Sequence, residues 1–146
     1  PGADQFGPGG IEGIQGSDVY DMPMGNERLM TGSEVGAAYA PVYFEYDSSR
    51  IAPAERGKLE QVADEMKRRR GLTLIVEGHC DERGSREYNM ALGERRALAV
   101  RAYLIGLGVD ASRIQTKSYG EEKPAAMGHD EAAWSRNRRA ELVLYE

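Results

Sequence analysis

Residues 78–100 read GHCDERGSREYNMALGERRALAV and connect a predicted strand to a predicted helix. The apolar run from Leu72 to Val76 comes before them and is typical of a buried central strand. A charged turn follows Gly78, and Ser85 is suited to cap the amphipathic helix that comes next. Open α/β proteins bind ligands where a strand ends in a polar turn before a helix. This stretch therefore predicts the position of the functional site.

The rest of the chain supplies three more strands and two more helices around this unit. Alternating apolar residues predict a first strand in which Val42, Phe44 and Tyr46 share one face. The other expected elements are a helix from Pro53 to residues 67–70, strands at 113–119 and 139–145, and a short helix capped by Asp130. The order β-α-β-α-β-(α)-β predicts the α/β class, an α+β sandwich with two long helices packed on one mixed sheet.

Composition divides the chain into two parts. Residues 1–40 hold half of the glycines and six acidic residues against one basic residue, so they are predicted to form a flexible tether. Met22, Met24, Leu29 and Met30 could also form a short partner-binding segment there. Residues 41–146 form the predicted domain, in which acidic and basic residues balance. A balanced domain on an acidic tail argues against nucleic-acid binding, which normally uses an excess of basic residues.

The polar residues near the central strand favour recognition over catalysis. Cys80 is the only cysteine, which excludes an intramolecular disulfide. Adjacent strand residues point to opposite faces, so His79, Cys80 and Asp81 are not expected to share a metal ion or to form a nucleophile and base pair. No phosphate loop or nucleophile elbow occurs. We therefore expect no catalytic residue, no cofactor and no metal.

Two charged residues stand out in residues 78–100. Helical spacing puts Arg96 on or beside the apolar stripe of its helix, where its charge needs a carboxylate, a route to solvent or an anionic ligand. Asp47, Asp81 and Glu94 are candidate internal partners. Asp81 lies in the turn, and Arg96 lies far enough along the helix that both can bind one ligand only if the turn folds back over the helix.

Four motifs in this order resemble the OmpA-like C-terminal domain family. They are GHCDERG at 78–84, EYNMALGERRA at 87–97, SYGEEKP at 118–124, and GHDEAA at 128–133 followed by NRRA at 137–140. The resemblance covers about residues 42–145. Within that family, the DERG turn and the HDEAA segment are most similar to the branch of peptidoglycan-associated lipoproteins, and less similar to the outer-membrane porins or flagellar stators.

The resemblance implies a non-catalytic domain that grips the diaminopimelate side chain of the peptidoglycan stem peptide. It assigns the ammonium of that side chain to Asp81 and its carboxylate to Arg96, and it places Tyr46, Asp47, Arg83, Asn89 and Leu92 in the same groove. Residues 137–139 match a motif that supports the groove. Tyr46 stands where phenylalanine is usual in the branch, and Cys80 where threonine or asparagine is common in the family.

The same resemblance implies a periplasmic protein held at the outer membrane by an N-terminal lipid and docked to proteins of the Tol system. No lipid-acceptor cysteine heads the sequence, so this anchorage is implied by the resemblance alone. The alternative reading is a protein-interaction module of the same fold that no longer binds peptidoglycan.

Overall fold

The computed structural model describes residues 33–36 and 39–146 as one mixed sheet with helices packed on it. The elements follow in the order β1 (Glu34–Gly36), β2 (Val42–Tyr43), the 3-10 helix η3 (Pro53–Glu55), α3 (Arg56–Arg68), β3 (Thr73–His79), α4 (Arg86–Gly106), the 3-10 helix η4 (Ala111–Arg113), β4 (Ile114–Gly120), α5 (Glu131–Asn137) and β5 (Arg139–Tyr145). No helix within these residues is long and apolar enough to span a membrane.

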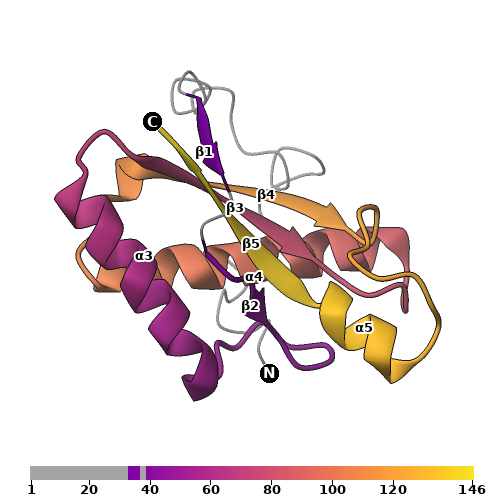
Figure 1. Cartoon of the computed structure of the whole chain (residues 1–146). Coiled ribbons are helices and arrows are strands. Elements are labelled where there is room, and N and C mark those ends of the chain that lie inside the picture. Colours follow the sequence, from indigo (N-terminus) through magenta and orange to yellow (C-terminus); the bar gives the residue numbers. More distant parts are fainter. Residues whose placement is uncertain (1–32, 37–38) are drawn as a thin grey trace.

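The sheet has the order β1-β5-β3-β4, and β2 also pairs with β5. β3 and β4 are parallel and are joined through α4, whereas β5 runs antiparallel to β1, β2 and β3. Figure 1 shows β5 crossing the middle of the molecule, with α5 at its start and the C-terminus beside β1. The predicted mixed sheet of the α/β class is confirmed.

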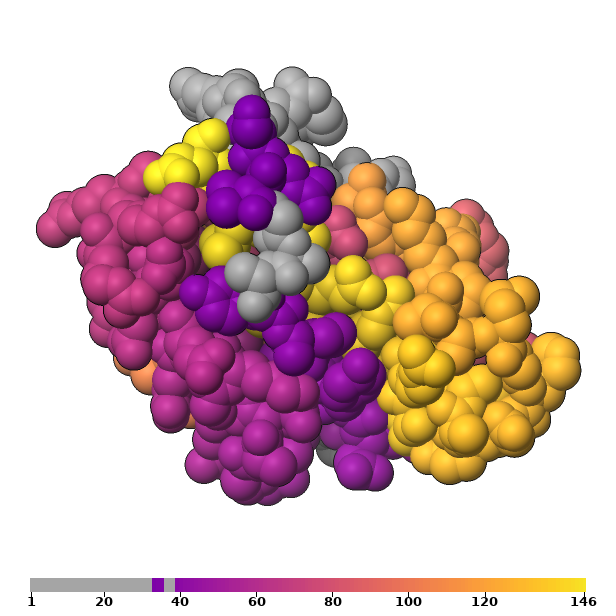
Figure 2. All heavy atoms as spheres, viewed as in Figure 1, coloured from indigo at the N-terminus to yellow at the C-terminus, as the bar shows by residue number. Residues whose placement is uncertain are grey.

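One hydrophobic core lies between the sheet and the two long helices. Helix α4 runs along the sheet, and α3 packs beside it. The core side chains are fully or almost fully buried and include Leu59, Val62, Ala63 and Met66 from α3, Ala97, Val100 and Leu104 from α4, and Val42, Leu74, Val76, Ile114, Ala140, Leu142 and Leu144 from the strands. In Figure 2, α3 and the region around α5 form opposite flanks of the visible face.

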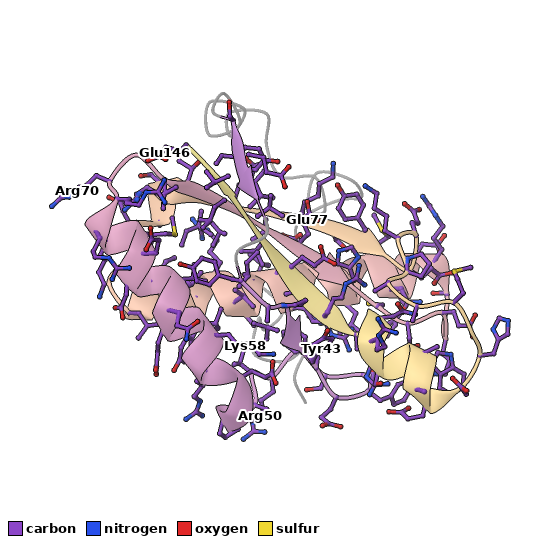
Figure 3. All side chains as sticks on the ribbon, viewed as in Figure 1. Tyr43, Arg50, Lys58, Arg70, Glu77 and Glu146 are labelled. Carbon is purple, nitrogen blue, oxygen red and sulfur yellow. The ribbon has the colours of Figure 1, made fainter. Side chains whose placement is uncertain are left out.

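Helix α3 is attached to the sheet at both of its ends. At its start, Lys58 Nζ donates to Pro41 O at 2.8 Å and lies 4.9 Å from the centre of the Tyr43 ring. Figure 3 labels this pair, and at the far end of the helix it labels Arg70 near Glu146. Arg69 forms an ion pair with Glu146 there. These contacts fix the start of the helix to β2 and its far end to the residue after β5.

The strand β2 is shorter than the first strand that the alternating apolar residues predicted. β2 ends at Tyr43, and Tyr46 is 58% exposed instead of sharing the buried face of Val42 and Phe44. Phe44 N still donates to Arg138 O at 2.9 Å, but Arg138 N donates to Trp134 O in α5, so Phe44 O accepts from Arg138 Nε at 2.8 Å and the ladder stops. The chain then turns, with Ser48 N donating to Glu45 O.

Residues 34–36, which the sequence analysis assigned to the tether, form the edge strand β1 on β5. A three-residue segment is too short to show strand periodicity, so the sequence gives no signal for it. The rest of the predicted tether lies largely outside the described residues, as do the four apolar residues considered as a partner-binding segment. The division at residue 40 stays a prediction.

Helix α4 approaches β3 most closely where two glycines face each other. A Cβ at Gly78 would lie within bonding range of Gly93 O, and a Cβ at Gly93 would overlap Ser118 Oγ and come to 3.0 Å from Gly78 O. Only glycine at both positions permits this backbone contact. It holds the start of α4 against the end of β3, where the predicted site lies.

Candidate functional site

One small pocket is lined by all seven residues that the sequence analysis proposed for ligand binding. The loop after β2, the turn between β3 and α4, and α4 itself supply its walls, which consist of Tyr46, Asp47, Cys80, Asp81, Arg83, Tyr88, Asn89, Leu92 and Arg96. The sequence reasoning missed Tyr88, which is 44% exposed on the first turn of α4 and gives no core signal. The pocket brings the seven residues together, and their roles stay predictions.

Arg96, which is 1% exposed, is the largest fully buried side chain in the described part of the chain. Its guanidinium donates three hydrogen bonds to backbone carbonyls, from Nε to Ser48 O at 2.8 Å, from Nη1 to His79 O at 2.8 Å and from Nη2 to Glu45 O at 3.1 Å. Burial lowers its pKa from the usual value. These bonds use three of the five N–H groups of a guanidinium, which leaves donors for a ligand.

Of the internal partners considered from sequence, Asp81 and Asp47 form no ion pair with Arg96 and act on it only through their charges, whose effect on its pKa is smaller than that of burial. The Phe44 ring lies 5.3 Å from its guanidinium carbon and gives a weak cation–π contact. A buried charge that is paired only with carbonyl dipoles is a strong site for an anionic group.

Asp81 is 4% exposed and is held by two arginines. Arg83 donates to it from its backbone N at 3.0 Å, from Nε at 3.2 Å and from Nη2 at 2.8 Å, and Arg138 Nη1 lies 3.6 Å from Oδ2. Burial alone would raise the pKa of Asp81, but the hydrogen bonds and charges of these arginines lower it on balance. Asp81 is therefore a carboxylate at neutral pH.

Arg83 lies between two aromatic rings. Its guanidinium carbon is 4.1 Å from the centre of the Tyr46 ring and 3.9 Å from that of Trp134 on α5. Trp134 Nε1 donates to Glu82 at 2.9 Å, and His129 Nδ1 lies 2.7 Å from the same carboxylate. His129 of the GHDEAA segment and Trp134, the residue after it, thus hold the turn through Glu82, a contact that sequence spacing did not reveal.

The first-strand end is held in an unusual backbone conformation. Asp47 has φ +57°, in the left-handed region, and is the only described non-glycine residue with a positive φ. Aspartate tolerates this region better than most residues, at a cost of order 1 kcal/mol. The Tyr88 hydroxyl donates to the Asp47 carboxylate. This contact connects the loop after β2 to α4 across the pocket.

The turn folds back over the start of α4, which the sequence analysis identified as a requirement for a shared site. Asn89 Nδ2 donates to Arg83 O at 3.1 Å and to Asp81 O at 3.4 Å, and Cys80 Sγ lies 3.2 Å from Asn89 O. The Arg96 side chain extends back toward the helix N-terminus, as helical side chains do, and reaches His79 O. Together these two features bring Asp81 and Arg96 to one pocket.

The two consecutive arginines at the start of β5 face opposite sides of the sheet. Arg138 faces the site, where Nη2 donates to Glu131 at 2.9 Å beside the contact with Asp81. Arg139 donates to Glu141 at 2.6 Å on the other side. Residue 137 supports the loop after β4, because Asn137 Oδ1 accepts from Ala125 N at 2.6 Å and Ala126 N at 2.9 Å.

The charges around the pocket balance. Among the residues that line it, two guanidiniums, of Arg83 and Arg96, face two carboxylates, of Asp47 and Asp81. Such a site suits a small ligand group that carries both an anion and a cation, because a phosphate would leave the carboxylates repelled and a simple amine would leave Arg96 without a counter-ion.

Comparisons with known sequences and structures indicate the family of the chain. Residues 43–138 match the model of the OmpA family. A peptidoglycan-associated lipoprotein of Pseudomonas aeruginosa is 44% identical over 97% of this chain and 84% of its own length. One of Pseudomonas putida is 50% identical over 72% of this chain and 63% of its own length, so that match spans less than two thirds of the relative. The crystal structure of the peptidoglycan-associated lipoprotein from Burkholderia pseudomallei is 45% identical, covers 73% of this chain and 91% of its own, and superposes with a TM-score of 0.72.

Proposed function

This chain belongs to the OmpA family, and we propose that its pocket binds the diaminopimelate side chain of a peptidoglycan stem peptide. Its relatives are named for their association with peptidoglycan, and the domain is a binding module and not an enzyme. The proposal depends mainly on the state of Arg96. Its side chain is 1% exposed, two of its N–H groups are not used in hydrogen bonds, and it forms no ion pair within the described residues.

In the proposed complex, Arg96 binds the distal carboxylate of diaminopimelate. The three carbonyls that accept from it already hold the guanidinium in place, so the ligand does not have to order a flexible side chain. A charge-assisted hydrogen bond in a desolvated pocket is stronger than one at the surface. Leu92, which is 4% exposed, contributes an apolar wall suited to the methylene groups of the ligand.

Asp81 binds the ammonium of the same side chain and shares its oxygens between that group and Arg83. The Nε contact of Arg83, at 3.2 Å, is the longest of its three bonds to Asp81 and the first to be displaced. Arg83 keeps its position between Tyr46 and Trp134 when this bond is lost, because the two rings hold the guanidinium plane. A carboxylate accepts up to about four hydrogen bonds, which allows this sharing.

At the level of the cell, we propose that the domain connects the outer membrane to the wall. An N-terminal lipid would provide the membrane attachment, and proteins of the Tol system would be its partners. The proposal rests on the named relatives and on the pocket, and it assigns the wall contact to residues 41–146.

Titration calorimetry with two synthetic stem peptides tests the proposal. One peptide carries meso-diaminopimelate, and the other carries lysine, which lacks only the distal carboxylate. The unaltered protein should bind the lysine peptide at least about tenfold more weakly, because the buried Arg96 then stays unpaired. Equal affinity for the two peptides would refute the role of Arg96 without any change to the protein.

Variants complete this test on the protein side. Asp81→Asn keeps the shape of the side chain and should weaken diaminopimelate binding by more than about tenfold, whereas Asp64→Asn on the exposed side of α3 should not change it. In a pull-down with purified sacculi, Asp81→Asn should likewise bind more weakly than the unaltered protein and Asp64→Asn should bind equally well. Undiminished binding by Asp81→Asn would reject this residue as the ammonium ligand, and no binding of either peptide would favour the protein-interaction module instead.

A further inference from the structure

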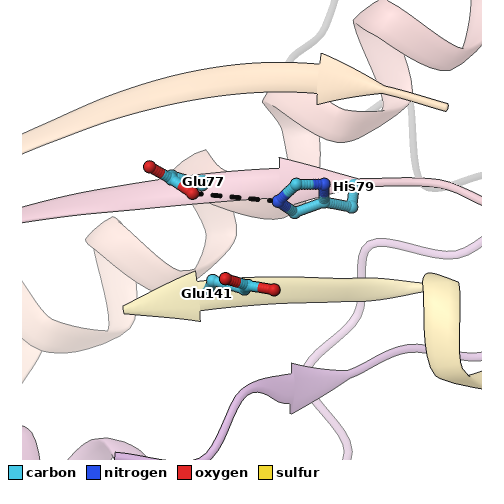
Figure 4. Close-up of side chains that lie close together, drawn as sticks. All are labelled: Glu77, His79 and Glu141. Carbon is cyan, nitrogen blue, oxygen red and sulfur yellow. Dashed lines mark ion pairs between the residues drawn. The ribbon is translucent and has the colours of Figure 1, made fainter. Parts of the chain in front are cut away.

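Three potential metal ligands meet on the face of the sheet that points away from the long helices. Gly78 faces α4, so its strand neighbours Glu77 and His79 point to the opposite face. Glu141 on β5 pairs directly with Glu77. Figure 4 shows the three side chains grouped across β3 and β5. One ligand atom from each lies within 4.8 Å of the others, and His79 Nε2 is 3.9 Å from Glu77 Oε1.

His79 lacks the hydrogen bonds that a buried imidazole requires. It is 2% exposed, and neither Nδ1 nor Nε2 has a hydrogen-bond partner. Its ring stacks on Tyr119 with 5.3 Å between the ring centroids, which fixes its orientation. A buried polar group without a partner costs about 1–3 kcal/mol, so such a group needs an explanation. A metal ion bound at one ring nitrogen would be a partner for that nitrogen.

The two carboxylates of this group also need a cation. Like charges directly opposite each other on neighbouring strands are destabilising. Arg139 Nε lies 2.6 Å from Glu141 and offsets one of the charges. Lys117 is the β4 neighbour of Glu77, but its Nζ lies over the Tyr119 ring at 5.1 Å. Neither basic residue forms an ion pair with Glu77, so this carboxylate is available to a cation.

We propose that Glu77, His79 and Glu141 bind a Zn²⁺ ion. One imidazole nitrogen with two carboxylate oxygens is a donor set that zinc accepts, whereas Mg²⁺ and Ca²⁺ prefer oxygen ligands alone. Zinc bonds of about 2.0–2.2 Å require the ligand atoms to approach one another. The side chains of Glu77 and Glu141 are 20% and 38% exposed and can rotate toward a fixed His79. Water would occupy the fourth position.

The sequence analysis expected no metal site because it considered only adjacent residues. Alternation along a strand excludes a site made from His79, Cys80 and Asp81, but it places Glu77 and His79 on the same face. The third ligand comes from a strand distant in sequence. His79 also connects the two sites, because its carbonyl accepts from Arg96 Nη1 at 2.8 Å.

Competition between the whole chain and a chromophoric zinc chelator tests the site. We expect one Zn²⁺ per chain, and no binding of Mg²⁺ at the same concentration. Glu141→Gln and Glu77→Gln should each weaken zinc binding at least tenfold, and both carboxylates are exposed enough that their replacement preserves the fold. Glu122→Gln, which removes an exposed carboxylate paired with Arg86, should leave zinc binding unchanged.

His129 beside Glu82 is the competing place for an ion, because it is the only other histidine. His129→Gln should leave zinc affinity unchanged, and the ring ¹⁵N resonances of His79 should shift when zinc is added. Failure to bind zinc, loss of binding in His129→Gln, or unchanged affinity in Glu141→Gln would each overturn the proposal.

Discussion

The contact between Gly78 and Gly93 predicts that a single methyl group on α4 destabilises the domain. In Gly93→Ala, the new Cβ overlaps Ser118 Oγ and lies 3.0 Å from Gly78 O. Moving the Ser118 hydroxyl away would break its bond to Met90 O, at 2.7 Å, and the bond that it accepts from Gly120 N, at 3.2 Å. The alternative is to displace α4 from the sheet.

The expected change in the free energy of unfolding is the sum of two destabilising effects and one stabilising effect. Overpacking costs about 1–3 kcal/mol, and the two lost hydrogen bonds cost roughly 1 kcal/mol each. Alanine gains about 1 kcal/mol over glycine in a helix interior. The free energy of unfolding should therefore fall by roughly 2–4 kcal/mol, although helix propensity alone predicts a rise.

Urea unfolding followed by circular dichroism measures this change. Gly106→Ala is the matched control on the same helix, because a Cβ there meets no atom within 4 Å and should stabilise by up to about 1 kcal/mol. The double variant Gly93→Ala/Ser118→Ala should have nearly the same free energy of unfolding as Gly93→Ala, since the hydrogen bonds of the hydroxyl are already lost in the single variant. If Gly93→Ala proved as stable as Gly106→Ala, the close approach of helix and sheet would be refuted.

Three further predictions concern single residues around the site. Because Arg83 and Arg138 lower the pKa of Asp81, this carboxylate stabilises the fold above its unfolded-state pKa near 3.9, and the stabilisation is lost as the pH falls through the lower folded value. Asp81→Asn should thus flatten the acid limb of an unfolding-versus-pH curve, and an unaltered limb would contradict the pairing. Burial raises the pKa of the Cys80 thiol to about 11, so a thiol reagent at pH 8 should react only after unfolding, and fast labelling of the native protein would contradict this burial. Asn137→Ala leaves the two backbone N–H groups that it accepts without a partner and should lower the unfolding free energy by roughly 2–4 kcal/mol, whereas Ser135→Ala, as a control, should change it by less than about 1 kcal/mol.

Local sequence signals predicted the main elements of the fold. The N-cap at Ser85 is confirmed by its bond from Tyr88 N, and that at Asp130 by its bond from Ala133 N. Continuous or alternating apolar residues predicted β3 and β5, because burial of one face imposes that spacing. β1 and the early end of β2 could not be predicted, since both depend on pairing with β5 and on Arg138, which is distant in sequence.

The candidate site was predicted in part for a similar reason. Helical spacing located Arg96 on the buried side of α4, and the polar turn located Asp81. Spacing could not show that Arg96 would bond three carbonyls instead of a carboxylate, because these carbonyls come from the loop after β2 and from the last residue of β3, which only the fold brings together. Trp134, which is half-buried, and Tyr88, which is exposed, were missed, since neither belongs to a periodic apolar pattern.

The most direct test of the proposed function is a thermodynamic cycle between Arg96 and the ligand carboxylate. Titration calorimetry would measure the affinities of the unaltered protein and of Arg96→Gln for the diaminopimelate peptide and the lysine peptide. Arg70→Gln serves as the control at the distant end of α3 (Figure 3). The account predicts a coupling energy of about 2–5 kcal/mol, with Arg96→Gln unable to distinguish the two peptides. A folded Arg96→Gln protein that still prefers the diaminopimelate peptide by the full factor would contradict it.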